Sequence, residues 1–209
     1  MKLYYTKGTC SLAVRIVIHE MKLTCEFESV DLHTKKTETG KDFLKINPKG
    51  SVPALVLDDG TLLTENAVIQ QYLADTHQAR ELLPLTGDLS RYRVLEWLNF
   101  IGTELHKGLG PLFNPQIPDP LKEEIFKPKL NKSFDFVNHH LEGSGYLTGK
   151  SYTLADSYLF VTLRWLEGFN IPLVKWSHLA AYFERIKERE AVFQALREEG
   201  LASPVSCTR

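Results

Sequence analysis

The sequence predicts an α/β domain with the element order strand, helix, strand, then strand, strand, helix, followed by a domain of helices only. Two short apolar segments near the N-terminus flank a segment of helical periodicity, and the turn signal Asp58-Asp59-Gly60 lies between two more. Beyond residue 87, apolar side chains recur at helical spacing. We therefore expect an N-terminal α/β domain over residues 1–80 and an all-α C-terminal domain over residues 87–209.

The first three elements form a βαβ unit. A strand is predicted over residues 2–6, and a helix begins at Cys10 or Ser11 and ends near Met21. Apolar side chains occupy most of the circumference of this helix, which predicts that it is buried. The alternating segment 25–32 is predicted to be the second strand.

Residues 47–73 supply two more strands and a helix, and the resulting order of elements is thioredoxin-like. A turn at residues 47–50 precedes Val52-Pro53, and Thr64 is expected to cap a helix with Glu65 in its first turn. If the Val52-Pro53 bond is cis, the backbone N–H and C=O of Val52 can pair with an extended ligand. The helix N-terminus favours an anion, whereas Glu65 can accept an ammonium group. An ordinary hairpin-to-helix corner is the alternative.

The C-terminal domain is expected to contain five helices. The first two cover residues 89–109 and 121–141, separated by several prolines, and Pro128 is expected to kink the second. A helix that follows Thr153 is apolar nearly all round and belongs at the centre of the domain, with Thr153 and Asp156 at capping-box spacing. Two further helices are predicted over residues 179–189 and 190–199.

Composition argues against several classes of partner. Lys and Arg number 25 against 26 Asp and Glu, so no basic excess points to nucleic acid or an anionic membrane. The N-terminus has no signal-peptide pattern, and no apolar run is long enough to span a membrane. The three cysteines have no metal-ligand spacing, and their low, odd count fits a reducing compartment. We expect a cytoplasmic protein without a metal.

Cys10 is the first candidate for chemistry. It lies at the start of the first helix, where the helix dipole and unpaired N–H groups favour a thiolate. The chain reads Cys10-Ser11-Leu12-Ala13, without a second cysteine nearby, so an external thiol must resolve any disulfide formed at Cys10. A small buried residue at a helix start is the alternative. Cys25 is expected in the core and Cys207 in the C-terminal tail.

Six segments in order carry a family resemblance. They are Gly8-Thr9-Cys10, Lys35-Lys36-Thr37, Asn47 to Pro53, Leu63-Thr64-Glu65, Glu104 to Lys107, and Tyr152 to Phe160. Together they resemble a bacterial glutathione S-transferase of the beta class, over almost the whole chain.

The resemblance implies a homodimeric detoxification enzyme that conjugates glutathione to hydrophobic electrophiles. Cys10 would face the glutathione sulfur and could hold it as a mixed disulfide, Val52 before a cis Pro53 would pair with the cysteinyl unit, and Ser11 and His106 would be further catalytic candidates. The expected glutathione contacts are Cys10, Lys35 (glycyl carboxylate), Val52, Pro53, Glu65 and Asn66 (γ-glutamyl end), His106, and, from the partner subunit, Asn99, Thr103 or Glu104. His106 and Lys107 would border the hydrophobic site.

Several alternatives stay open at this point. Ser11 or Thr9 could donate to the thiolate in place of Cys10. The family usually has a small residue or Ser where this chain has Asn66, whose side chain could crowd or tighten the γ-glutamyl pocket. Lys35 could be a solvated lysine and His106 an ordinary histidine at the edge of the core. A non-catalytic binding or regulatory protein is the main rival, and a glutaredoxin-like reductase is disfavoured by the missing second cysteine.

Overall fold

The computed structural model describes residues 1–202 and divides the chain into two compact units. The first unit combines residues 1–78 with the segment that begins at Lys187, and the second covers residues 79–186. Each unit is described separately below.

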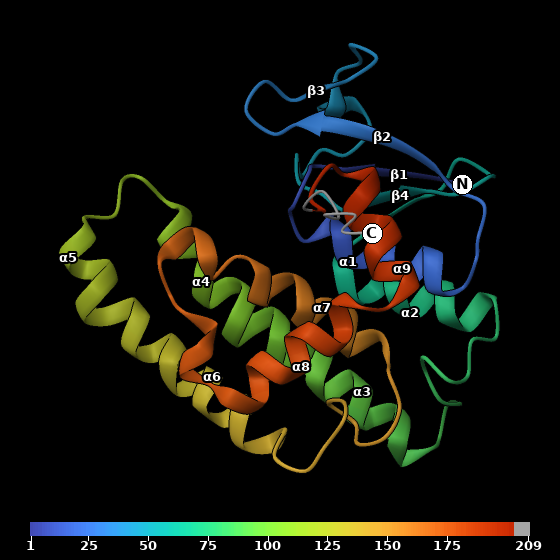
Figure 1. Ribbon diagram of the computed structural model, residues 1–209. Helices are drawn as coiled ribbons and strands as arrows, with labels where there is room; N and C mark the ends of the chain where they lie inside the picture. The colour runs from blue at the N-terminus through green and yellow to red at the C-terminus, as the bar shows by residue number, and fades with distance from the viewer. Residues whose placement is uncertain (203–209) are drawn as a thin grey trace, which may run out of the picture. The chain divides into compact units, whose positions relative to one another are not determined.

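The first unit contains a five-stranded sheet of order β3-β2-β1-β4-β5 (Figure 1). Strand β1 pairs parallel with β2 and antiparallel with β4, as the βαβ–ββ order requires. The remaining pairs, β2 with β3 and β4 with β5, are antiparallel. The strands are β1 (Lys2–Tyr5), β2 (Glu26–Asp31), β3 (Lys36–Thr37), β4 (Ala54–Val56) and β5 (Leu62–Thr64).

In the described part of this unit three α-helices accompany the sheet, namely α1 (Ser11–Glu20), α2 (Asn66–Thr76) and α9 (Glu190–Glu198), and a short 3₁₀ turn lies at Phe43–Lys45. The central helix, α1, is buried from Ser11 through Ile18, as its sequence predicts. It packs against α2 and, along most of its length, against α9 (Figure 1). Helix α9, the last helix in the described residues, therefore belongs to the first unit, because it covers a side of α1 that the sheet leaves open. The sequence-based division, which assigned residues 87–209 to the helical domain, differs from the structure in this respect.

The second unit is entirely helical apart from one isolated bridge between Tyr146 and Gly149. Its helices are α3 (Leu89–Phe100), α4 (Lys107–Phe113), α5 (Asp119–Leu121), α6 (Lys127–His140), α7 (Leu154–Arg164) and α8 (Ser177–Lys187), and two short 3₁₀ turns lie at Glu167–Phe169 and Leu173–Lys175. Helix α7 is buried from Leu154 through Leu163, which confirms its expected central position.

Both long helices of the second unit contain a π-helical turn. Ile101–His106 joins α3 to α4, and Lys122–Phe126 joins α5 to α6. Pro128 lies in the first turn of α6, where a proline is tolerated, so it does not end the helix, as the sequence predicts. Pro111, which was expected to end the first long helix, lies inside α4, and the helix ends two residues later at Phe113.

The capping box predicted at Thr153 and Asp156 is present. The Asp156 carboxylate accepts hydrogen bonds from the backbone N–H and hydroxyl of Thr153, at 2.8 and 3.0 Å. It also accepts from the backbone N–H of Leu147 at 3.0 Å and from the Tyr182 hydroxyl at 2.9 Å. Asp156 is fully buried, and burial raises its pKa despite these donors. One side chain thus fastens α7, α8 and the preceding loop together.

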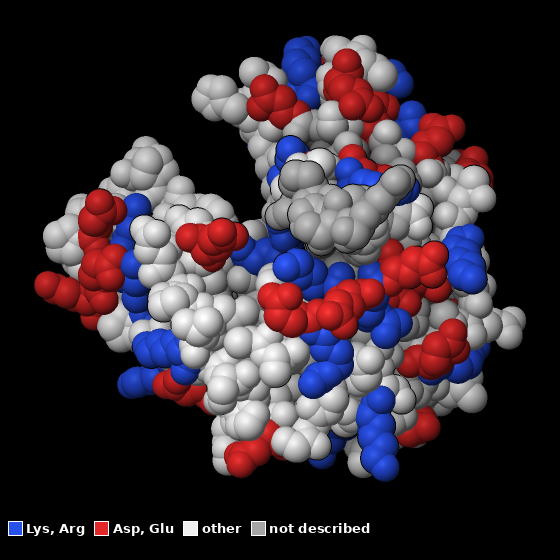
Figure 2. Space-filling model, viewed as in Figure 1, with Lys and Arg blue, Asp and Glu red and all other residues white. Residues whose placement is uncertain are grey.

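No helix among residues 1–202 combines the length and apolar character needed to cross a membrane. On the face shown in Figure 2, acidic and basic side chains are interspersed. This distribution agrees with the balanced charge of the sequence.

We predict that Asp156→Ala destabilises the protein strongly. The substitution removes a helix cap, worth about 1 kcal/mol, and leaves buried donors unsatisfied at about 1–3 kcal/mol. Urea unfolding followed by circular dichroism should show a loss of roughly 2–4 kcal/mol in the free energy of unfolding. Asp119→Ala is the matched control, because the Asp119 side chain is 89% exposed, and it should change stability by less than about 0.5 kcal/mol. Similar losses for both variants would contradict the capping role.

Candidate functional site

Cys10 lies where the sequence predicts, at the N-cap of α1. It is half-buried, and its Sγ lies 3.3 Å from the carbonyl oxygen of Val52. The thiol therefore lies between the first N–H groups of α1 and the loop that precedes β4. Cys25 differs, because burial raises the pKa of its thiol and its Sγ donates to the carbonyl of Glu26. Of these two thiols, Cys10 has the placement that favours a thiolate.

The loop opposite Cys10 contains a cis peptide bond between Val52 and Pro53. Val52 is buried, and its backbone N–H has no acceptor among the residues that the structure describes. Buried backbone donors are nearly always paired in native proteins. The Val52 N–H and C=O therefore form a short backbone edge, next to the Cys10 thiol, that suits an extended peptide ligand.

Glu65 has an unusual backbone conformation. Its φ of 74° and ψ of 120° lie in a region that residues other than glycine rarely adopt. Glu65, and not Thr64 as expected, is the N-cap of α2, and Thr64 is the last residue of β5. The Lys49 ammonium binds the Glu65 carboxylate at 2.7 Å and the Thr64 hydroxyl at 2.9 Å. Lys49 gave no signal in the sequence beyond its place in a turn.

Asn66 lies immediately after Glu65, and its side chain turns inward. Its amide nitrogen donates to the Cys10 carbonyl at 2.6 Å, and its amide oxygen accepts from Gln70. Asn66 is only 7% exposed. The sequence left open whether this side chain crowds or tightens the γ-glutamyl pocket; in the structure it links the start of α2 to the start of α1.

Lys35 is not a freely solvated lysine. It has a φ of 57°, and its ammonium donates to the carbonyl oxygen of Gly50 at 2.8 Å. Gly50 itself has a φ of 62°, and a β-carbon there would lie 3.4 Å from the Lys35 ammonium. The cation is thus held at the turn that precedes Val52, within the same corner as Glu65 and Cys10.

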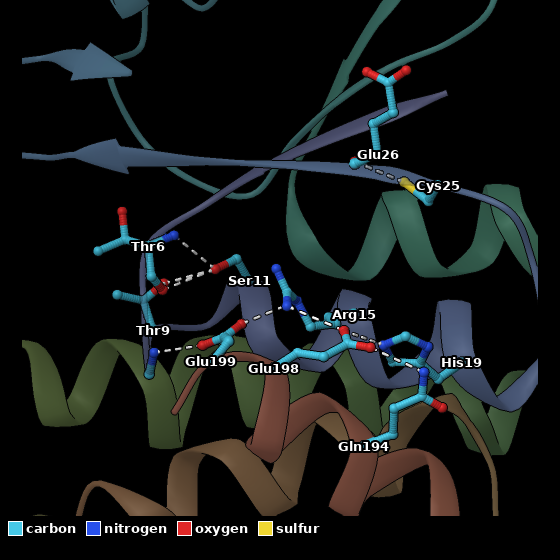
Figure 3. A network of polar contacts seen from close by, with 11 residues as sticks. Thr6, Thr9, Ser11, Arg15, His19, Cys25, Glu26, Gln194, Glu198 and Glu199 are labelled. Atoms are coloured by element: carbon cyan, nitrogen blue, oxygen red, sulfur yellow. Dashed lines mark hydrogen bonds and ion pairs between the residues drawn. The ribbon is translucent and has the colours of Figure 1, made fainter. Parts of the chain in front are cut away.

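The hydroxyl groups of Thr9 and Ser11, on either side of Cys10 in the sequence, form hydrogen bonds within the loop itself (Figure 3). Ser11 is fully buried, accepts from the backbone N–H of Thr6 at 3.3 Å, and lies 2.9 Å from the Thr9 hydroxyl. The Thr9 hydroxyl also donates to the Thr6 carbonyl at 2.9 Å. These contacts close the loop, so the geometry favours a structural role for Ser11 over the catalytic role expected from the sequence.

A buried ion network fixes α1 and the Gly8 turn (Figure 3). Arg15, 2% exposed, lies 3.3 Å from the Glu198 carboxylate and 3.4 Å from that of Glu199. Glu199 also accepts the backbone N–H of Gly8 at 2.7 Å. His19 lies 2.9 Å from Glu198. Glu199, at the C-terminal end of α9, therefore binds the turn that leads into Cys10. The sequence did not reveal this contact.

In the second unit, His106 is the last residue of the π-helical turn Ile101–His106. Its Nδ1 lies 2.5 Å from the Tyr158 hydroxyl, and its ring meets the Trp165 ring edge to face at a centroid distance of 5.0 Å. Trp165 also contacts Phe113, which contacts Phe169. Burial, together with the charge of Lys107, lowers the pKa of His106 from 6.5 to about 4.

The other predicted residues of the second unit lie at the surface of the same helix. Asn99, Thr103 and Lys107 are exposed, and the Thr103 hydroxyl donates to the Asn99 carbonyl at 3.1 Å. Glu104 is half-buried and lies 3.9 Å from the ammonium of Lys129. The π-helical turn thus contains Thr103, Glu104 and His106, which differ in exposure.

Two family models match the chain, the glutathione S-transferase N-terminal domain over residues 8–76 and the glutathione S-transferase C-terminal domain over residues 100–190. A curated relative from Escherichia coli O157:H7, glutathione S-transferase GstA, is 46% identical over 201 residues, which cover 96% of this chain and 100% of the relative. The chain belongs to the glutathione S-transferase family.

Solved structures agree with this assignment. A glutathione transferase from Methylococcus capsulatus is 50% identical, with a TM-score of 0.93 and coverage of 96% of this chain and 99% of that chain. A beta class enzyme from Sphingomonas chungbukensis is 40% identical, with a TM-score of 0.92 and coverage of 97% and 100%. The resemblance to the beta class, the thioredoxin-like plus helical fold and the transferase activity expected from the sequence are confirmed.

Glutathione is the co-substrate of this transferase, as it is for the family. Within residues 1–202, no group of three or more His, Cys, Asp or Glu side chains is arranged to hold a metal ion.

We predict that Asn66→Ser destabilises the transferase by roughly 1–3 kcal/mol, because it removes the donor to the Cys10 carbonyl and the acceptor of the buried Gln70 amide. Urea unfolding measures this loss. Asn131→Ser, in the half-exposed part of α6, is the control, since Asn and Ser have similar helix propensities and a change within about 0.5 kcal/mol is expected. If Asn66→Ser unfolds like the wild type, the inward amide contributes nothing to the fold.

We also predict that His106 stays neutral to unusually low pH. Its folded pKa of about 4 lies below the ordinary 6.5, so the unfolded chain binds the proton more readily. The contribution of His106 to stability is therefore complete above pH 6.5 and is lost as the pH falls from 6.5 towards about 4. Titration of the ring resonances by NMR tests this. A midpoint near 6.5 for His106 would contradict the burial effect.

Proposed function

We propose that glutathione binds to the first unit of this transferase with its sulfur beside Cys10 and its cysteinyl backbone paired with Val52. The backbone N–H of the buried residue Val52, which has no acceptor among residues 1–202, is the observation that carries this proposal. A ligand amide that accepts from this N–H and donates to the Val52 carbonyl would satisfy both groups. The same ligand would bring its thiol close to Cys10, whose Sγ already lies 3.3 Å from that carbonyl.

The two ends of glutathione fit the charged groups of the corner. The γ-glutamyl end carries an ammonium and a carboxylate, which suit the Glu65 side chain and the N–H groups at the start of α2. Because Lys49 pairs with Glu65 at 2.7 Å, an incoming ammonium must share or displace this contact. The glycyl carboxylate suits Lys35, whose ammonium is held at Gly50.

The chemistry has two branches that share the thiolate. In conjugation, the glutathione thiolate attacks an electrophilic carbon, a sulfur–carbon bond forms, and the leaving group departs with its electron pair. In exchange, the Cys10 thiolate attacks a mixed disulfide of glutathione with another thiol, which releases that thiol as its thiolate and leaves glutathione disulfide-bonded to Cys10. A glutathione thiolate then restores the Cys10 thiolate and forms glutathione disulfide.

We infer that the second unit supplies the surface that holds the electrophile. The ring cluster of His106, Phe113, Trp165 and Phe169 has the apolar and aromatic character that such a ligand needs. The exposed Lys107 would border it. The low pKa of His106 keeps this cluster neutral at physiological pH.

A homodimer is part of the proposal. Each unit exposes large apolar side chains, Val68 and Tyr72 on α2 and Tyr92 and Phe136 in the helical unit, as expected of surfaces that meet another chain. In the dimer, Asn99, Thr103 or Glu104 would reach glutathione bound to the partner subunit. The balanced charge and low cysteine count lead us to place the dimer in the cytoplasm.

We predict that the protein gains the mass of one glutathionyl group after exposure to glutathione disulfide, and that Cys10→Ala does not. Cys25→Ala is the matched control, because burial raises the pKa of that thiol and it should behave as the wild type. Intact-mass spectrometry gives the result, and a conjugation assay with a dinitrohalobenzene is run alongside.

The possible outcomes separate the two branches. If Cys10→Ala conjugates as fast as the wild type, Cys10 serves disulfide exchange and another group activates the glutathione thiol. If the wild type neither gains the glutathionyl mass nor conjugates above background, the proposed site is wrong and a non-catalytic binding role is favoured.

A further inference from the structure

We propose that Tyr158 is a positioning residue that holds His106 as the neutral tautomer with its proton on Nε2, so that Nε2–H is the donor offered to the ligand. The proposal rests on the proposed function in placing His106 at the hydrophobic site. Beyond that function, it specifies which nitrogen of the His106 ring carries the proton and identifies Tyr158 as the residue that determines this.

The contact between the two side chains is direct. The Tyr158 hydroxyl, from α7, lies 2.5 Å from Nδ1 of His106. Tyr158 is 4% exposed, so its ring is fixed by the core of the second unit. Gly102, one turn before His106, lies beside this ring, because a β-carbon at residue 102 would be in ordinary contact with the Tyr158 hydroxyl, at 3.9 Å.

The orientation of the imidazole is set from two sides. The Tyr158 ring meets it at an interplanar angle of 86°, and the Trp165 ring meets it at 64° with centroids 5.0 Å apart. Edge-to-face contacts of this kind favour one ring orientation over others. His106 therefore has a defined Nδ1 partner and a defined ring plane.

The direction of the hydrogen bond follows from the chemistry of the two groups. A phenolic hydroxyl is a better donor than a neutral imidazole N–H, and the bare nitrogen of a neutral imidazole is a good acceptor. The ring is neutral at pH 7, because burial lowers its pKa to about 4. The Tyr158 hydroxyl therefore donates to Nδ1, and the single ring proton resides on Nε2.

The second ring nitrogen is available for a ligand. Within the described part of the chain, Nε2 of His106 forms no hydrogen bond, and the residue is only partly buried. A neutral N–H donor can stabilise an anion that develops on the electrophile without giving up its proton. The opposite tautomer would present a lone pair to that negative charge and would disfavour it.

The decisive test measures the tautomer directly. In protein labelled with ¹⁵N-histidine, long-range ¹H–¹⁵N correlation spectra at pH 7 distinguish a protonated from a bare ring nitrogen. For the wild type we expect a bare Nδ1 and a protonated Nε2 at His106. For Tyr158→Phe, which keeps the ring but loses the hydroxyl, we expect a mixture of tautomers. Tyr152→Phe, another buried tyrosine of this unit, which packs on Tyr146, should match the wild type.

Kinetics test whether the tautomer matters for turnover. Tyr158→Phe should lower kcat for conjugation by about three- to tenfold, the effect of one net hydrogen bond, with little change in the KM for glutathione. His106→Gln keeps a donor near the Nε2 position, and adding Tyr158→Phe to it should have less than about a twofold further effect, because Tyr158 acts through His106.

The outcomes distinguish this inference from the proposed function. A proton on Nδ1 in the wild type, or an unchanged tautomer in Tyr158→Phe, overturns the inference even if the enzyme conjugates normally. An equal loss of kcat on adding Tyr158→Phe to the His106→Gln variant also overturns it, since Tyr158 would then act elsewhere. If the tautomer shifts as expected in an enzyme that does not conjugate, the positioning by Tyr158 stands and the assignment of His106 to the hydrophobic site fails.

Discussion

The arrangement of the first unit depends on ion pairs between the buried Arg15 guanidinium and two carboxylates near the end of α9. Arg15 lies in the middle of α1, between the rings of Tyr5 and Phe27 at 4.1 and 4.0 Å from their centroids. A buried charge without an opposite charge costs several kcal/mol, so this helix position is tolerated only if carboxylates reach it. Glu198 and Glu199, at the far end of the described chain, supply them. The first unit is therefore complete only when α9 has packed on α1.

This requirement also connects stability to the candidate site. Glu199 pairs with Arg15 and at the same time accepts the Gly8 N–H, two residues before Cys10. Asn66, at the start of α2, donates to the Cys10 carbonyl and so connects α2 to the start of α1. The backbone around the thiol is thus held by contacts from α2 and α9 as well as by α1 itself, before any ligand binds. Such preorganisation reduces the ordering that binding requires.

Most of the fold could be predicted because its signals are local. The apolar spacing of α1, the hairpin turn at Asp58–Gly60, and the capping residues Thr153 and Asp156 each act within a few residues. The contacts that the sequence could not reveal join distant positions or depend on three-dimensional shape. Glu199 looks like a solvated acid at a helix end, Lys49 like a turn lysine, and Asn66 like an outward γ-glutamyl contact. Ser11 was expected near the thiol, but the loop geometry directs its hydroxyl inward.

The π-helical turn at Ile101–His106 has a consequence for the register of its helix. A π turn accommodates one residue more than an α-helix of the same length, so the residues that follow it are rotated by about 100° relative to a continuous α-helix. Thr103 and Asn99 face solvent before this offset takes full effect, whereas His106, at its end, faces Tyr158 and Trp165. A single extra residue therefore lets one helix present polar groups in one direction and a partly buried imidazole in another. Deleting one residue within this turn would restore a uniform helix and move His106 out of its aromatic surroundings.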